Sequence, residues 1–313
     1  KTKRDGSIIW AKRLLGPTMT GYYFKLLATR DSGFIVLYNT FSQGIVAKFN
    51  GTGTPEWERQ FNYPGFNPNL ELNAIRQNES DGYYLAGHVR GGGIFTAALN
   101  ASGTVLWTKY YRHKNAPNME HWVGDLIVLP EDQSFIVVGN ADTPHSDALL
   151  IRFSPPGDLL WAKTVQAPNT LYFLNAVQPA PDGKLLALTG DFPFQASRND
   201  LILFDRNGQV SGITRYAPEN GYWRLQALAT VPGDGYALGA TYNNMLPAFL
   251  RLNSDGTVRW ANVYTSFTSI KKALTDLSVT GGSNLLAVGD HFQVGQKTDL
   301  RFLKADSRGT AGA

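Results

Sequence analysis

Asp147–Lys163 reads Asp-Ala-Leu-Leu-Ile-Arg-Phe-Ser-Pro-Pro-Gly-Asp-Leu-Leu-Trp-Ala-Lys, and this stretch indicates the fold of the whole chain. It contains two short apolar runs, Ala148–Phe153 and Leu159–Trp161, separated by a segment rich in Pro and Gly. Short runs of branched and aromatic residues between turn residues are typical of β-strands, and Gly supplies the positive φ that a tight turn needs. The stretch therefore predicts two antiparallel strands joined by a hairpin turn.

Copies of this pattern recur along the chain at intervals of roughly 50 residues, which is the period of a repeat architecture. Each copy places two further strands before the hairpin, joined by a tight turn such as Asp81-Gly82, and the second of them usually ends in Gly. The first strands begin at Phe24, Leu72, Val123, Leu174, Leu225 and Leu274. Four consecutive antiparallel strands in each copy predict the blades of a β-propeller. No segment shows a sustained helical period, so we expect almost no helix.

The two ends of the chain complement each other. The sixth copy stops after its third strand, Leu300–Leu303, whereas the N-terminal segment Asp5–Lys12 has the sequence of a fourth strand. We therefore predict an all-β chain that forms one propeller domain over residues 1–313. It has six blades of four antiparallel strands, and the N-terminal strand closes the last blade. Each backbone hydrogen bond of that pairing contributes roughly 0.5–1.5 kcal/mol.

The composition excludes several classes of protein. The 313 residues are 43% hydrophobic and contain no Cys, so a disordered chain, a disulfide scaffold and a thiolate metal site are excluded. No apolar run reaches the length of about 18 residues that a membrane helix needs, so we expect no membrane insertion. The net charge of +4 is mild, and we interpret the basic N-terminal residues as a solvated terminus rather than a nucleic-acid contact. With neither an initiator Met nor a signal peptide, we expect a processed protein or a piece of a longer one.

Five Trp residues occupy the predicted fourth strands, and we expect them to pack between blades: Trp10, Trp57, Trp107, Trp161 and Trp260. The fourth copy has Gly212 at this position. Two residues further on, four copies carry a basic residue: Lys12, Arg59, Lys109 and Lys163. We interpret these charges as a device that prevents edge-to-edge pairing of the outermost strands.

The repeat resembles the propeller repeats of large secreted bacterial surface proteins, which are often cargo of the type IX secretion pathway. The resemblance rests on Asp-Gly-aromatic-aliphatic-aliphatic, then Gly, then the motifs of Asp147–Lys163, and it covers essentially the whole chain. It implies a secreted or cell-surface location and a role in adhesion or assembly. The turn Asn253–Trp260 also looks like the Asp-box of sialidases, but Gly256 lies four residues before Trp260 rather than three, so we assign no sialidase residue.

The order of the strands predicts which side of the blades carries function. The second-to-third loops and the connections between blades share one side, and they are longer and more variable than the turns on the other. Function usually lies on loops held by a rigid frame. Rings and imidazoles just before the first strands could stack on a sugar or anchor a protein partner, or they could close the end of the blade core. We predict ligand contacts at Tyr23, His121, Trp122, Tyr172 and Trp223.

Polar residues at the ends of second strands add three candidates for ligand binding: His88, Asp191 and Asp290. They could bind a polar ligand, although Asp also commonly begins loops. They belong to different blades, and the five His residues show no metal-ligand spacing, so we predict no metal and no cofactor. Gly91-Gly92-Gly93 precedes no helix and is not a phosphate loop. We assign no catalytic residue.

These observations favour a non-catalytic extracellular module for binding, adhesion or surface assembly that uses the long-loop side. The predicted partner is a protein or a surface glycan. The alternative is a carbohydrate-active propeller, a glycoside hydrolase or lyase, with a central pocket on the same side. It would need an Arg cluster or two carboxylates roughly 5–10 Å apart.

Overall fold

The structure is a computed structural model that describes residues 9–10, 22–40, 43–63, 70–141, 147–166, 173–190, 199–243, 246–265, 274–291 and 299–311. By its internal contacts the chain divides into two compact units. Unit 1 comprises residues 1–120 with 130–133, and unit 2 comprises residues 121–129 with 134–313.

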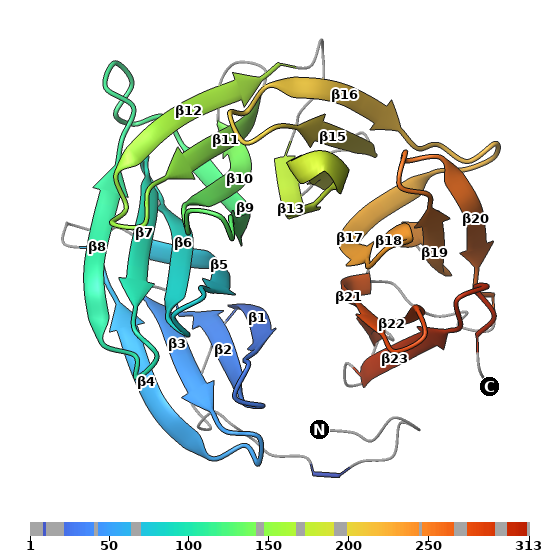
Figure 1. The fold of residues 1–313 in the computed structure, drawn as a ribbon, viewed down its shortest axis with the longest axis horizontal. Coiled ribbons are helices and arrows are strands. Elements are labelled where there is room, and N and C mark those ends of the chain that lie inside the picture. The colour runs from blue at the N-terminus through green and yellow to red at the C-terminus, as the bar shows by residue number, and fades with distance from the viewer. Residues whose placement is uncertain are drawn as a thin grey trace. The chain divides into compact units, whose positions relative to one another are not determined.

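Unit 1 contains two sheets of four antiparallel strands, and in each sheet the strands lie side by side in chain order (Figure 1). The first blade consists of β1 (Tyr22–Ala28), β2 (Phe34–Asn39), β3 (Gly44–Phe49) and β4 (Pro55–Phe61). The second blade consists of β5 (Leu70–Gln77), β6 (Tyr83–Val89), β7 (Ile94–Leu99) and β8 (Val105–Tyr111).

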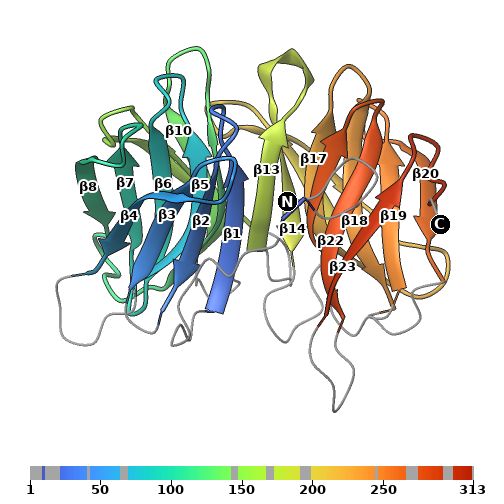
Figure 2. The ribbon, with the colours of Figure 1, turned by 90° about the horizontal axis from the view of Figure 1, so that it is seen from below.

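Unit 2 contains the other four sheets of the described chain, with the same strand order (Figure 2). The third blade consists of β9 (His121–Val128), β10 (Phe135–Ala141), β11 (Asp147–Phe153) and β12 (Leu159–Val165). The fourth has β13 (Phe173–Pro179), β14 (Leu185–Gly190), β15 (Asp200–Phe204) and β16 (Val210–Arg215). The fifth has β17 (Trp223–Val231), β18 (Gly235–Tyr242), β19 (Leu246–Leu252) and β20 (Val258–Val263). The sixth has β21 (Leu274–Thr280), β22 (Asn284–His291) and β23 (Asp299–Ala305).

The prediction of six antiparallel blades with almost no helix is confirmed. Within the described residues the one helical element is a single 3-10 turn, η1 (Pro181–Gly183). The predicted closing strand Asp5–Lys12 lies outside the described residues except for Ile9 and Trp10, so the closure stays a prediction.

Each first strand carries a β-bulge, and in the second and third blades the bulge explains a Gly of the second strand. The extra residues are Tyr23, Asn73, Gly124, Asn175, Gln226 and Thr275. A bulge brings the first strand's backbone against the second strand. A Cβ at Gly87 would overlap the carbonyl oxygen of Glu71, and one at Gly139 would overlap that of Trp122. The second strand therefore needs Gly at these positions.

The turns that follow the third strands have one geometry in all six blades. A Gly with φ between 72° and 85° ends each turn: Gly53, Gly103, Gly157, Gly208, Gly256 and Gly309. Its amide donates to the carbonyl three residues earlier, as Gly53 does to Asn50 at 2.9 Å. Because L side chains rarely adopt this φ, the Gly sets where each hairpin turns.

Trp residues of the fourth strands pack against the Gly of the next blade's turn, as predicted. A Cβ at Gly103 would lie 2.5 Å from the Trp57 ring, and one at Gly208 would lie 2.8 Å from the Trp161 ring. Trp260 is placed in the same way against Gly309. Each of these three Trp rings therefore packs on a position where only Gly fits, because a Cβ there would overlap the ring.

Trp10 takes the same position toward the first blade. Its ring carbons lie 2.8–3.2 Å from a Cβ built at Gly53, and its ring centroid lies 6.2 Å from that of Phe34. Trp10 therefore has the contact that a fourth-strand Trp makes with the following blade.

The basic residues that follow the Trp residues also have a structural role that the sequence did not reveal. The Nε of Arg59 donates to the Gly103 carbonyl at 2.7 Å, and its guanidinium lies over the Trp57 ring. Lys109 and Lys163 likewise lie over the Trp two residues earlier. These cations therefore hold their own Trp in place as well as charging the outer strands.

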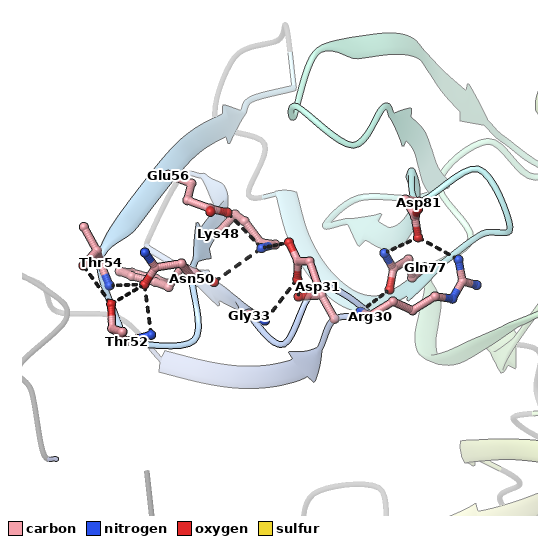
Figure 3. Close-up of polar contacts among 12 residues, drawn as sticks. Arg30, Asp31, Gly33, Lys48, Asn50, Thr52, Thr54, Glu56, Gln77 and Asp81 are labelled. Atoms are coloured by element: carbon pink, nitrogen blue, oxygen red, sulfur yellow. Dashed lines mark hydrogen bonds and ion pairs between the residues drawn. The ribbon is translucent and has the colours of Figure 1, made fainter. Parts of the chain in front are cut away.

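A buried cation lies beneath the turn side of the first blade (Figure 3). The side chain of Lys48 is 1% exposed, and its Nζ lies 2.7 Å from Asp31 Oδ2 and 2.9 Å from Glu56 Oε2. The hydrogen bond from Lys48 lowers the pKa of Asp31 to about 2. Burial alone would lower the pKa of Lys48, but the hydrogen bonds to both carboxylates raise it. This ion triad joins β3 to the turn between β1 and β2 and to the start of β4.

Candidate functional site

The eight predicted ligand contacts fall into three groups. Tyr172 and Asp191 lie outside the described residues. Tyr23 lies at the bulge of β1, and Asp290 lies in β22 opposite Leu300, but their side chains are also outside what the structure describes. The remaining four have described side chains: His88, His121, Trp122 and Trp223.

His88 belongs to a buried polar cluster in the second blade. It is 2% exposed, and its Nδ1 donates to the Oδ1 of Asn73, the bulge residue of β5, at 2.9 Å. Its Nε2 lies 3.7 Å from Oε2 of Glu71, whose Oε1 accepts from Nε of Arg90 at 3.0 Å. Burial, and then the charge of Arg90, lowers the pKa of His88 to about 3. The imidazole is thus neutral at neutral pH, and it fixes the bulge of β5 through Asn73.

The other three described candidates lie in unit 2. His121 begins β9 and is 8% exposed. Trp122 is half-buried and lies opposite Asn140 in the pairing of β9 with β10. Trp223 is 9% exposed, packs on Tyr242 at a centroid distance of 5.1 Å and belongs to the hydrophobic core of the fourth and fifth blades. Trp223 fits the alternative that these rings close the blade core, and its role in binding stays a prediction.

Unit 1 contains an open groove that sequence reasoning did not identify. Its volume is about 380 Å³. It lies between the C-terminal end of β4 and strand β8. It is lined by Gln60, Phe61, Asn62, Tyr63, Phe95, Val105, Thr108, Lys109 and Tyr110. Phe61 and Phe95 form its apolar floor, with centroids 5.8 Å apart in an edge-to-face arrangement. The groove therefore combines an aromatic floor with amide and hydroxyl groups along its rim.

Two of the lining residues, Tyr63 and Tyr110, contact Arg112 beside the groove, and these three side chains are called its end wall. The rings of Tyr63 and Tyr110 have centroids 4.6 Å apart. The guanidinium of Arg112 lies 5.8 Å and 5.0 Å from these two centroids. Its Nη2 donates to the Tyr63 hydroxyl at 3.1 Å, and its Nε donates to the Tyr110 hydroxyl at 2.9 Å.

Tyr110 is anchored in turn, because its hydroxyl donates to the carbonyl of Gly92 in the loop between β6 and β7. Burial raises the pKa of the Tyr110 hydroxyl, and the hydrogen bond to that hydroxyl raises the pKa of Arg112. Arg112 therefore carries its charge at any physiological pH. The three side chains form a positioned, charged aromatic end wall.

The available sequence signal for this site was indirect. Tyr63 and Arg112 lie where β4 and β8 lead into the connections between blades, on the side predicted to carry function. Nothing in the repeat indicated that the ring of Tyr63 pairs with that of Tyr110 in β8, because the two residues are distant in sequence and have no counterpart in the quoted motifs.

The described residues contain no cluster of three or more His, Cys, Asp or Glu side chains arranged to hold a metal ion. None of their helices has the length and hydropathy needed to cross a bilayer.

Comparisons with known proteins bear on the fold. No family model matches the chain, and no curated protein matches its sequence. A solved protein of unknown function from Dyadobacter fermentans is similar in structure, with a TM-score of 0.62 and 10% identity over 90% of this chain and 93% of that one. The Dos1 propeller gives a TM-score of 0.54 at 12% identity and covers 93% of this chain and 74% of its own. A periplasmic gluconolactonase from Pseudomonas aeruginosa gives 0.55 at 13% identity and covers 86% and 85%.

These likenesses, together with the six sheets, show the class of the fold. The chain is an all-β, six-bladed β-propeller. At sequence identities this low, the similar structures support the fold alone.

Proposed function

We propose that this propeller is a non-catalytic binding module of a secreted or cell-surface protein, with a role in adhesion or surface assembly. The observation that carries the proposal is the groove between the first and second blades, with its aromatic floor and its charged end wall. Its volume of about 380 Å³ lies within the range of small-ligand sites, roughly 300–1,000 Å³.

The groove is also built before any ligand arrives. Tyr63, Tyr110 and Arg112 already hydrogen-bond to one another, and Tyr110 is tied to the β6–β7 loop. Side chains held in this way lose little conformational freedom on binding, and this loss is one of the main costs of association. A rigid blade pair that presents a fixed aromatic surface suits recognition.

The secreted location is supported by the resemblance of the repeat to bacterial surface propellers, and a chain without Cys is compatible with it. The carbohydrate-active alternative shares its fold with the periplasmic gluconolactonase. That alternative depends on a central pocket, whereas the groove lies along β4 and β8, so the two proposals concern different places in the fold.

A binding assay with product analysis tests this proposal. The folded chain is applied to an array of neutral and acidic glycans, and each bound glycan is then incubated with the protein and examined by mass spectrometry. Saturable binding with recovery of the intact glycan is expected. Binding to no glycan on the array, or conversion of the bound one, would overturn a non-catalytic glycan-binding role.

A further inference from the structure

The groove between β4 and β8 has an uneven charge. None of its nine lining residues is Asp or Glu, and one is Lys109. At its end lies Arg112, which is followed by His113 and Lys114, and all three are exposed. A groove with one Lys in its described lining, no carboxylate among those residues and exposed cations beside it favours an anionic ligand, because unlike charges attract.

The nearest carboxylates of the flanking segments already accept hydrogen bonds. Glu58 lies on the opposite face of β4 from Phe61, and its Oε1 accepts from Nε2 of the lining residue Gln60 at 3.3 Å. Glu120 accepts the amide of Gly91, in the β6–β7 loop, at 3.4 Å. The charge of Arg112 therefore has no carboxylate partner among the residues that line the groove.

Arg112 is placed to meet a carboxylate in a fixed orientation. A guanidinium has five N–H donors in a planar fork that matches a carboxylate. The Tyr63 and Tyr110 hydroxyls accept from Nη2 and Nε. The side chain is exposed, so its other donors can reach a ligand that lies in the groove.

The remaining lining chemistry indicates the rest of the ligand. Tyr63 and Tyr110 contribute aromatic surface to the lining, whereas Asn62 and Thr108 contribute groups that both donate and accept hydrogen bonds. A pyranose ring has the same division, since its C–H face is apolar and its hydroxyls radiate from the edge. An acidic peptide also carries donors and acceptors, but a pyranose sets them around the edge of an apolar ring face, as the lining residues are combined here.

We propose that the groove between β4 and β8 binds an acidic oligosaccharide. A uronate carboxylate pairs with the Arg112 guanidinium, and the sugar ring packs on Tyr63 and Tyr110. The assignment rests on the proposed binding function and gives it a ligand class.

Calorimetric titration with an oligogalacturonate tests this assignment. The wild-type chain is expected to bind it, and Arg112→Gln is expected to weaken binding roughly tenfold, the loss that follows removal of a charge-assisted hydrogen bond. The matched control is Arg308→Gln, an exposed Arg in the turn after β23 with a side chain 87% exposed. It should change the affinity by less than about twofold.

Two further probes separate the possible failures. The methyl-esterified oligogalacturonate keeps the sugar rings but lacks the charge, so equal affinity for it would overturn the role of Arg112. The second probe is a glutamate peptide of equal charge. If it binds as tightly as the oligogalacturonate and loses affinity in Arg112→Gln, the ligand of the groove is an acidic peptide rather than an acidic oligosaccharide. In both outcomes a binding function survives, whereas a chain that binds none of these probes and nothing on the glycan array loses both proposals.

Because Arg112 also supports Tyr63 and Tyr110, its replacement could disturb the fold. The melting temperature of Arg112→Gln is therefore compared with that of the wild type. The wild-type chain provides an independent readout, since its affinity for the oligogalacturonate should fall as salt is added. An affinity that does not respond to salt would contradict the proposed ion pair.

Discussion

The first and fourth blades carry different residues at equivalent positions of their outermost strands. Trp57 lies opposite Lys48 in the first blade, whereas Gly212 lies opposite Leu203 in the fourth. The Trp57 ring of the first blade therefore covers the turn of the second blade. In the fourth blade Gly212 has no side chain that could cover the turn of the fifth.

The fourth blade makes the contact in another way. The hydroxyl of Tyr216, just beyond β16, donates to the Gly256 carbonyl at 2.6 Å. In the first blade the Gly103 carbonyl accepts instead from Arg59. The comparison teaches that the turn containing the Gly is constant, and that its carbonyl accepts a hydrogen bond in both blades. The side chain that donates this bond and the side chain that packs on the Gly differ between the blades.

Replacing the receiving Gly should have the largest effect and should distinguish the two blades. Gly103→Ala places a Cβ 2.5 Å from the Trp57 ring at a φ of +78°. Strain and overpacking together should cost about 3 kcal/mol. Gly256→Ala has the same strain, but its Cβ meets only the Tyr216 hydroxyl at 3.3 Å, so about 1 kcal/mol is expected. Urea unfolding measures both, and equal losses would contradict the role of the Trp57 ring.

Tyr216→Phe tests the substitute contact. Tyr216 is 6% exposed, and burial raises its pKa to about 12. Loss of its hydrogen bond to Gly256 should cost about 1 kcal/mol in the free energy of unfolding. Tyr242→Phe is the control, because its hydroxyl bonds to Asn220 in an exposed place. A Tyr216→Phe variant as stable as this control would show that the hydroxyl is dispensable.

Lowering the pH should reveal a smaller difference in stability between variants of the two blades. The pKa of Asp31 is lowered from 3.8 to about 2, so its pairing with Lys48 stabilises the fold above pH 3.8 and is lost as the pH falls toward 2. With the Asp31 side chain 56% exposed, solvent screening reduces this to roughly 0.5–1 kcal/mol. Asp31→Asn should therefore flatten the decline of the melting temperature in this window. Asp182→Asn, in the corresponding turn of the fourth blade, is the control for replacing an Asp in this turn.

Filling the gap in the fourth blade should give the smallest effect, and a favourable one. A Cβ at Gly212 would meet no atom within 4 Å, and the residue lies inside β16. Gly212→Thr should stabilise the chain by about 0.5 kcal/mol, since Gly weakens a strand and Thr favours one. A lower urea midpoint would mean that the position needs Gly for a reason other than space.

The strands and turns could be predicted because they are encoded locally. Gly at 103 and its equivalents, and Asp-Gly pairs such as Asp81-Gly82, set the turns through their own backbone preferences. The bulges of the first strands were not predicted, although the Gly residues opposite them, such as Gly87, were visible in the repeat. A bulge changes which residues face each other, and single-strand periodicity does not reveal it.

The groove was beyond prediction for a related reason. It depends on Tyr63 and Tyr110 coming together from different blades, and on the Arg112 side chain folding back over both rings. The repeat describes what blades share, whereas this end wall uses residues in which they differ. The predicted aromatic contacts before the first strands, by contrast, followed the repeat, and Trp223, one of those with described side chains, is part of a core.

The contact of each Trp with the following blade has a consequence for how this chain could grow or shrink by recombination. The sequence repeat runs from one first strand to the next, but Trp57 completes its packing on Gly103, which belongs to the next copy. A crossover between copies would thus separate a Trp from the Gly on which it packs. Gene segments exchanged between a Trp and the Gly that receives it should disrupt folding, whereas segments joined between a receiving Gly and the Trp that follows it, as between Gly53 and Trp57, would keep every such pair on one side of the junction.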